Sequence, residues 1–447
     1  MAGLIVEIVS GVPFNDYVQQ NIFDPLGMTR SSFHEPLPTN LEKHMAGSYK
    51  VELGAYVEKD FEIIANFGPA GAQSATSPDM VRFGQAILNG GELDGKRILK
   101  PETVEEMLTP NFSHDDRTTA MLLGFYETDY NGHRVVGHGG DTIYFHSYLG
   151  IDHEADLVFF ISFASDGGSP TRSAFAPALY DQFFPRDELP PVPPEDFSER
   201  GGKYAGNYGF WRGNFSKIEK AFSLGSAIQV APTEDNTLLV AFAGGAKQYV
   251  EVEENLFREL DPNMSLVAGI SPRLIAFQEN DAGAITGFVF DGLPFMSARK
   301  LAFYEKANFN FSLLGFSFFI FLAVVLRRWF QRRELARLTT YDRTAFNAAF
   351  YASLAHLVTL AVGAVVVSIV AKDLINGFPP IFKAWLTLPI LSTLAGLYLL
   401  FHTVGVWKEK LFNGFWARIR FTFVTLSVLF MAWFYYFCNI LGVQYMV

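Results

Sequence analysis

Cysteine is almost absent from this chain of 447 residues, whose only one is Cys438. A single cysteine cannot form a disulfide within the chain, and it cannot build a metal site of several cysteine ligands. The class of small domains held together by disulfides is therefore excluded.

Positive charge is scarce before residue 306. Residues 306–447 contain 13 Lys and Arg against 4 Asp and Glu, and the whole chain has a formal net charge of −11. The first 305 residues therefore carry a charge of about −20. Such an acidic segment argues against a nucleic-acid partner.

The N-terminus lacks the features of a secretory signal. It has no early cation, it contains Glu7, and its apolar stretch is short. Leu4, Ile5, Ile8 and Val9 instead fall on one face of a helix that Gly11 ends. We read this stretch as the middle of a domain.

Long apolar runs are missing from the first 305 residues and frequent afterwards. A helix of about 20 residues, rising about 1.5 Å each, crosses the roughly 30 Å hydrocarbon core of a bilayer. The sequence predicts four such spans, Phe309–Leu326, Phe346–Ala371, Ala384–Val406 and Phe421–Leu441.

The basic residues predict the orientation of these spans. Arg327 to Arg337 holds five arginines, and Lys408 to Arg420 holds four Lys and Arg, whereas Lys372 to Lys383 holds only two cations. The positive-inside rule makes the first two loops cytoplasmic, so we expect the soluble parts and the C-terminus on the extracytoplasmic side. Without membrane carboxylates, His356 and His402 make a poor ion path, which favours an anchor over a transporter.

The soluble part divides at a proline-rich segment. Before it we expect helices at 16–23 with Asn15 as N-cap, from Ser77 as N-cap to Gly90, from Pro101, and at 171–184. Residues 185–196 predict a stiff linker. Residues 197–304 are β-rich, with strands at 238–242, 249–252, 273–278 and 284–290 that suggest a small barrel or sandwich.

The run Gly137-His138-Gly139-Gly140 interrupts a strand-like pattern with a polar side chain and three glycines. Strands are predicted before it, at His133–Val136, and after it, within Tyr148–Ala164. Glycines allow close approach of a ligand, so we read the run as the edge of a cleft at a strand end. The alternative is a glycine-rich turn with one exposed histidine.

A metal site is the first alternative for the nearby His133, His138, Asp141, His146 and His153. His133 and His138 are five residues apart, so on one strand they point to opposite faces. No His-Glu-x-x-His or comparable ligand spacing occurs. We expect neither a metal nor another cofactor.

Several separated motifs together resemble the serine β-lactamase and penicillin-binding-protein-like hydrolases. They are Ala2-Gly3-Leu4-Ile5-Val6-Glu7, Ile22-Phe23-Asp24-Pro25-Leu26-Gly27-Met28, Pro69-Ala70-Gly71 with Asp79 and Phe83, and Gly137-His138-Gly139-Gly140. The resemblance implies an α+β fold for residues 1–184, an antiparallel sheet with helices. A barrel-like domain at 197–304 and four membrane helices within 305–447 complete the expected architecture.

Catalysis in that family uses a Ser-x-x-Lys, a Tyr-x-Asn or Ser-x-Asn, and a Lys-Thr-Gly or His-x-Gly. The resemblance makes His138, Gly139 and Gly140 the third element, on the substrate and oxyanion side. No Tyr-x-Asn occurs, and the one Ser-x-x-Lys, Ser297 to Lys300, lies in a predicted strand where the two side chains point apart.

We therefore expect a partial hydrolase domain whose nucleophile segment would precede Met1. The expected function is a membrane-anchored serine hydrolase that acts on an amide, lactam or ester of a small molecule or peptide, with this chain inactive alone. The alternative is a non-catalytic envelope protein that binds a ligand or signals through four spans, and a transporter-like bundle is a weaker third. In-frame codons for the missing motifs upstream of Met1 would favour the first.

Overall fold

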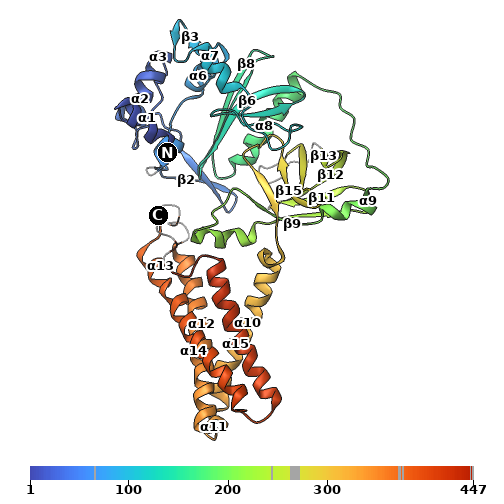
Figure 1. Ribbon diagram of the computed structural model, residues 1–447. Coiled ribbons are helices and arrows are strands. Elements are labelled where there is room, and N and C mark those ends of the chain that lie inside the picture. Colours follow the sequence, from blue (N-terminus) through green and yellow to red (C-terminus); the bar gives the residue numbers. More distant parts are fainter. Residues whose placement is uncertain are drawn as a thin grey trace. The chain divides into compact units, whose positions relative to one another are not determined.

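The computed structural model describes residues 1–64, 67–242, 245–261, 272–370, 374, 377–442 and 444 (Figure 1). It divides into two compact units. The first comprises Met1–Arg212 and Ile228–Lys300, and the second comprises Gly213–Ala227 and Leu301–Val447. The predicted division at 1–184, 185–196, 197–304 and 305–447 remains a prediction, because the first unit joins the sheet part and the barrel part.

The first unit begins with short helices. These are α1 (Ala2–Ser10), α2 (Phe14–Val18), the π-helical turn η1 (Gln19–Phe23), α3 (Asp24–Leu26), α4 (Thr39–Glu42), α5 (Gly68–Gly71), α6 (Ser77–Leu88) and α7 (Pro101–Leu108). Two small hairpins accompany them, β1 (Ser48–Glu52) with β2 (Ala55–Lys59) and β3 (Glu92–Leu93) with β4 (Lys96–Arg97).

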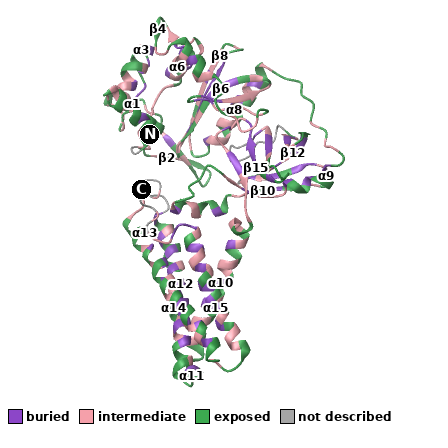
Figure 2. Cartoon of the chain, in the orientation of Figure 1, coloured by how far each residue is buried: buried purple, intermediate pink, exposed green. Residues whose placement is uncertain are grey.

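A four-stranded antiparallel sheet follows in the order β5-β6-β7-β8. Its strands are β5 (Tyr126–Tyr130), β6 (His133–Asp141), β7 (Phe145–Asp152) and β8 (Leu157–Ala164). One face packs on α8 (Gly168–Phe183) through Val135 and Tyr180. The other face packs on α6 and α7 through Val136 and Ile151. Figure 2 shows buried residues along these strands.

The remainder of the first unit is a closed barrel of eight strands. They are β9 (Gly206–Phe210), β10 (Ile228–Pro232), β11 (Leu238–Phe242), β12 (Gly245–Glu253), β13 (Leu256–Glu259), β14 (Leu274–Glu279), β15 (Ile285–Phe290) and β16 (Ser297–Lys300). Aromatic rings such as Tyr208, Phe277 and Phe288 fill its interior. Closure removes the free edges of the sheet, because β16 pairs with β9.

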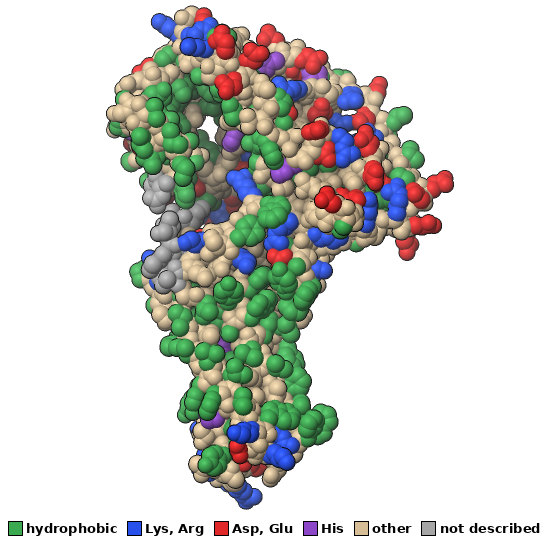
Figure 3. All heavy atoms as spheres, viewed as in Figure 1, with side chains coloured by type: hydrophobic (Ala, Val, Ile, Leu, Met, Phe, Trp, Pro, Cys, Tyr) green, Lys and Arg blue, Asp and Glu red, His purple; other side chains and the backbone are tan. Residues whose placement is uncertain are grey.

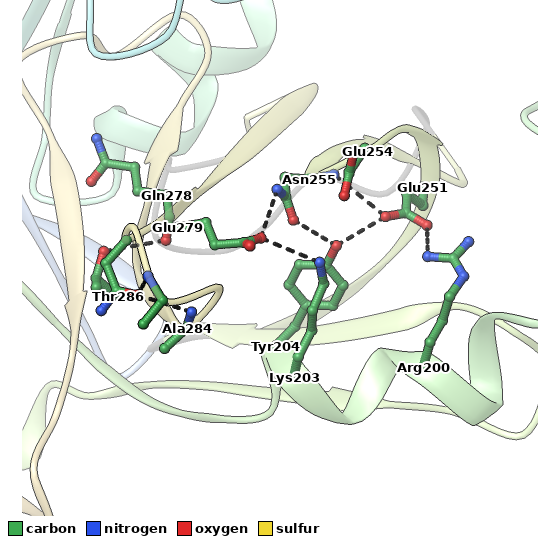
Figure 4. Close-up of polar contacts among 12 residues, drawn as sticks. Arg200, Lys203, Tyr204, Glu251, Glu254, Asn255, Gln278, Glu279, Ala284 and Thr286 are labelled. Carbon is green, nitrogen blue, oxygen red and sulfur yellow. Dashed lines mark hydrogen bonds and ion pairs between the residues drawn. The ribbon is translucent and has the colours of Figure 1, made fainter.

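A polar network ties the segment before β9 to the barrel (Figure 4). This segment contains α9 (Phe197–Arg200) and the 3-10 turn η3 (Gly201–Tyr204). Arg200 forms an ion pair with Glu251, and the Tyr204 hydroxyl donates to the same carboxylate at 2.9 Å. Asn255 donates to Glu279 at 3.1 Å. The buried carboxylate of Glu251 is therefore fully engaged.

The second unit is a helical bundle. It contains the 3-10 helix η4 (Ile218–Gly225), η5 (Phe303–Glu305), α10 (Ala307–Phe330), α11 (Arg332–Leu335), α12 (Thr340–Val370), α13 (Pro380–Trp385), α14 (Thr387–Lys408) and α15 (Phe415–Phe437). Polar side chains bond between its helices, as Thr359 does to Ser392 at 2.6 Å and Thr403 to Thr425 at 2.7 Å. Such bonds give these hydroxyls hydrogen-bond partners, which apolar lipid tails cannot provide.

Four of the described helices are long and apolar enough to cross a membrane, namely Ala307–Phe330, Thr340–Val370, Pro380–Lys408 and Phe415–Phe437. Hydrophobic side chains cover much of the bundle face seen in Figure 3. Four spans and the mixed α and β architecture are thus confirmed. Ala371 and Lys372, which belong to the predicted second span and its following loop, lie outside the described residues.

Two predicted helix starts are wrong. Pro13, not Asn15, is the N-cap of α2, and the Glu7 carboxylate accepts the Phe14 N–H at 2.8 Å, so the first turn is satisfied from outside. Thr76, not Ser77, caps α6 by accepting the Asp79 N–H. The helix expected at 171–184 spans Gly168–Phe183 instead. Local propensity locates such helices but leaves their ends uncertain by a few residues.

Candidate functional site

Gly137, His138, Gly139 and Gly140 lie inside β6, which continues to Asp141. The expectation of a strand end at the motif was wrong, because β7 pairs with β6 from the Val135–Asp152 pair as far as the Asp141–His146 pair. A long antiparallel partner holds even a glycine-rich run extended. The motif is therefore a rigid part of the sheet rather than a turn.

His138 and Gly140 share one face of the sheet, since they are two residues apart on a strand. This is the face of Val136, which packs on the α6 and α7 side. Val136 is buried, whereas His138 and Gly140 are exposed. The helices thus cover one end of this face and leave the end with the imidazole open.

The glycines of the motif differ in what surrounds them. A Cβ at Gly137 would lie 2.5 Å from the Leu149 carbonyl oxygen, and one at Gly139 would lie 3.0 Å from the Tyr126 hydroxyl. A Cβ at Gly140 would meet no atom within 4 Å. Packing within the described chain therefore explains the first two glycines but not Gly140. Glycine there is the residue expected where another molecule approaches the backbone.

The outer edge of β6 carries backbone amides next to this space. β5 pairs with β6 only as far as Tyr126 and Gly137, and no described strand continues along that edge. Beyond it the Gly139 N–H donates to the Tyr126 hydroxyl at 2.9 Å. Because N–H groups alternate between the two edges of a strand, the Asp141 N–H points the same way as that of Gly139.

Charged groups at the end of β6 are bound to one another. The Asp141 carboxylate accepts from Arg172 of α8 at 2.7 Å and lies 2.5 Å from Nδ1 of His146. The Glu62 carboxylate accepts the N–H of Ile143 at 3.0 Å in the loop that follows. These contacts fix the loop between β6 and β7 beside the open end of the face.

The barrel part also reaches this site. The Phe295 ring, from the loop between β15 and β16, lies 5.1 Å from the ring of Tyr126, and that ring lies 5.6 Å from the His138 imidazole. Arg212 stacks on Phe295 at 5.3 Å. Partial loss of water at the imidazole lowers the pKa of His138 below its usual value of 6.5. A hydrogen bond with the Gly139 backbone opposes this shift, and the nearby Arg212 charge adds to it.

The other histidines of the predicted region serve different contacts. His133 lies 2.9 Å from the buried Asp152, which also accepts from the Tyr180 hydroxyl at 2.8 Å. His153 borders a separate surface depression near Val104. In the part of the chain that the structure describes, no group of three His, Cys, Asp or Glu side chains is placed to hold a metal ion.

Ser297 and Lys300 lie on β16, the strand that was predicted for them. Ser297 is buried in the barrel, and the Lys300 ammonium donates to the Lys203 carbonyl at 2.9 Å. Both residues belong to the barrel wall, so they do not form a nucleophile and base pair at β6.

Sequence reasoning missed Tyr126, Arg172, Arg212 and Phe295. No local sequence pattern marks these residues as part of a site. Tyr126 lies on β5 and Arg172 on α8, whereas Arg212 follows β9 and Phe295 precedes β16. The pairing of β5 with β6, the packing of α8 and the packing of the barrel loop bring them to the glycine-rich part of β6.

Comparisons with known proteins relate the first part of the chain to β-lactamases and penicillin-binding proteins. The beta-lactamase family profile matches residues 1–181. The Bacillus subtilis protein PbpX, named for a penicillin-binding protein, is 28% identical over 134 residues, which cover 30% of this chain and 31% of PbpX. The Mycobacterium tuberculosis protein Rv1367c is 24% identical over 126 residues, which cover 27% of this chain and 31% of that protein.

A penicillin-binding protein homologue from Pyrococcus abyssi, described as octameric, is similar in structure at 21% identity and a TM-score of 0.35, covering 67% of this chain and 62% of that one. The matched region spans about a third of the length of the curated relatives. Residues 1–181 are therefore similar to the β-lactamase and penicillin-binding-protein-like family.

Proposed function

We propose that this chain is a membrane-anchored member of the family in which His138, Gly139 and Gly140 bind the acyl group of a substrate. The substrate class is an amide, lactam or ester of a small molecule or peptide. The observation that carries the proposal is the open space over Gly140 beside the exposed His138. A carbonyl group placed beside this space would accept from the Asp141 N–H at the outer edge of β6, because the Gly139 N–H already donates to Tyr126.

The chemistry that these residues supply is binding and polarisation. Acyl transfer also needs a serine and a base that removes its proton. The sequence has no Tyr-x-Asn, and its one Ser-x-x-Lys is in the barrel wall. We therefore propose that the 447-residue chain by itself binds an acyl ligand without forming an acyl-enzyme.

Labelling tests this division of roles. The full chain in detergent is treated with a fluorescent penicillin and with a fluorophosphonate, and we expect no covalent label. Reversible binding of the penicillin is then measured by calorimetry. Gly140→Val should abolish binding by filling the open space, whereas Gly202→Val, at another glycine with nothing within 4 Å, should not.

The outcomes separate the two candidate functions. Covalent label on any serine of this chain would overturn the proposed lack of an acyl-enzyme. Equal penicillin binding by Gly140→Val and Gly202→Val would overturn the site itself. Absence of the other two motifs favours the second candidate, a non-catalytic envelope protein that binds a ligand or signals. Binding that changes the labelling or mobility of the four-helix bundle would support it.

We also propose the orientation in the membrane. The arginines between α10 and α12, and the Lys and Arg residues between α14 and α15, would lie in the cytoplasm by the positive-inside rule. The site at β6, the barrel and the C-terminus would then lie outside. The spans anchor the protein in this proposal.

A further inference from the structure

A cavity of about 730 Å³ lies at the end of the bundle where α10, α11 and α12 meet. Its walls are of two kinds. Trp329, Phe346 and Phe350 contribute apolar surface, and Arg328, Arg332 and Arg343 contribute positive charge. The volume is in the range of small-molecule sites in proteins.

Two of the three arginines have neutral hydrogen-bond partners, and the third has none among the described residues. Arg328 donates to the side-chain oxygen of Asn347 at 2.6 Å, and its guanidinium lies 4.5 Å from the centre of the Phe350 ring. Arg343 donates to the Ala336 carbonyl at 2.7 Å. The Arg332 side chain has no hydrogen bond or ion pair with any residue that the structure describes.

No Asp or Glu is among the described residues that line the cavity. The ion pairs recorded in the structure all involve residues before 280. Asp342, which precedes Arg343 in the sequence, accepts from Thr339 at 2.8 Å and from the Phe412 N–H at 2.7 Å rather than from an arginine of the cavity. Three guanidinium groups at one cavity without an acid favour an anionic ligand with several oxygens.

The cavity lies at the depth of lipid headgroups. At about 1.5 Å per residue, the 31 residues of α12 extend about 46 Å, roughly 16 Å more than the hydrocarbon core. The predicted apolar span begins at Phe346, so we place the excess length at the start of α12, with Arg343 beyond the acyl chains. Figure 3 shows Lys and Arg side chains at this end of the bundle, below the apolar belt.

We propose that this cavity binds one anionic phospholipid. The phosphate diester contacts Arg328, Arg332 and Arg343, and the glycerol and upper acyl chains pack on Trp329, Phe346 and Phe350. Basic pockets between membrane helices are suited to such headgroups. The inference depends only on the bundle and is independent of any activity at His138.

Native mass spectrometry of the delipidated full chain tests the proposal, with phosphatidylglycerol and phosphatidylcholine added at equal concentration. We expect selective retention of phosphatidylglycerol. Arg332→Gln with Arg343→Gln should weaken its binding about fivefold for each arginine, because a cation near anionic lipid contributes roughly 1 kcal/mol. Arg333→Gln with Arg337→Gln is the matched control, since it removes the same charge from the same loop outside the cavity.

A second variant tests the volume of the cavity without changing its charge. Ala336→Phe places a ring in the cavity, and we expect loss of the retained lipid with unchanged gel-filtration and circular-dichroism profiles. Equal loss in both double variants, or equal retention of the two lipids, would overturn the proposal. So would competition by inorganic phosphate at the affinity of phosphatidylglycerol, which would make free phosphate the ligand.

Discussion

The glycines of β6 are required for different reasons. Gly137 packs against the Leu149 carbonyl, and Gly140 faces open space. Gly137→Ala should therefore lower the free energy of unfolding by about 1–3 kcal/mol through overpacking. Gly140→Ala should stay within about 0.5 kcal/mol of the original chain. Thermal or denaturant unfolding in detergent measures both, and equal losses would show that Gly140 is also determined by packing.

His138 is predicted to titrate below its usual pKa of 6.5, first because it loses water and then because Arg212 is near. Between the folded pKa and 6.5 the unfolded chain binds more protons. This group therefore lowers stability as the pH falls through that window and has no such effect above it. Arg212→Gln should raise the folded pKa toward 6.5.

NMR of the chain with labelled histidine follows the titration, and His138→Gln identifies the resonance. An imidazole that titrates above 6.5, or a midpoint that Arg212→Gln lowers, would contradict the assigned surroundings of the ring.

At the scale of elements, β8 is an exposed edge. It pairs with β7 over Leu157–Ala164, and among the described residues its other side meets a strand only just beyond its end, where Tyr49 of β1 bridges Ser165. Its sequence is apolar and rich in residues that favour strands, which makes such an edge prone to pair with another molecule. Ser162, which is exposed on this strand, is a suitable place for a charge.

Ser162→Lys should reduce concentration-dependent association of the purified chain, because a lysine on an edge strand opposes edge-to-edge pairing. Sedimentation velocity in detergent measures the association. Ser198→Lys, on the exposed side of α9, adds the same charge away from the edge and should leave association unchanged. If both variants associate equally, the edge of β8 is not the contact.

At the scale of the whole molecule, the proposed orientation makes a direct prediction. With Cys438 replaced by serine, a cysteine at Ser198 should react with an impermeant maleimide added to intact cells. A cysteine at Arg333 should react only after the membrane is opened, because its loop is basic. If the cysteine at Arg333 reacted in intact cells and the one at Ser198 did not, the opposite orientation would hold, with the β6 site in the cytoplasm.

The bundle itself shows how membrane histidines can be structural. His356 is buried, stacks on Phe321 at 5.2 Å and lies 3.1 Å from the Tyr435 hydroxyl. This interhelical contact agrees with the expectation of packing rather than transport. The second membrane histidine, His402, contacts the ring of Tyr398 one turn away in the same helix.

The amino-acid sequence by itself determined the features that depend on neighbouring residues. Apolar runs predicted the four spans, alternation predicted strands such as β11 (Leu238–Phe242), and separated motifs indicated the family. The sequence reveals such patterns because buried and exposed side chains alternate with a fixed period along a helix or a strand. The caps of α2 and α6 were missed because one residue, or one distant carboxylate, decides where a helix begins.

Tertiary structure alone decided which groups meet. Tyr126 and Phe295 are far apart in sequence, yet the Tyr126 ring contacts both Phe295 and His138, because β5 pairs with β6 and a barrel loop packs there. Closure of the barrel through β16 and β9, and the convergence of three arginines on one cavity, have the same origin. These contacts depend on long-range packing, which local periodicity does not encode.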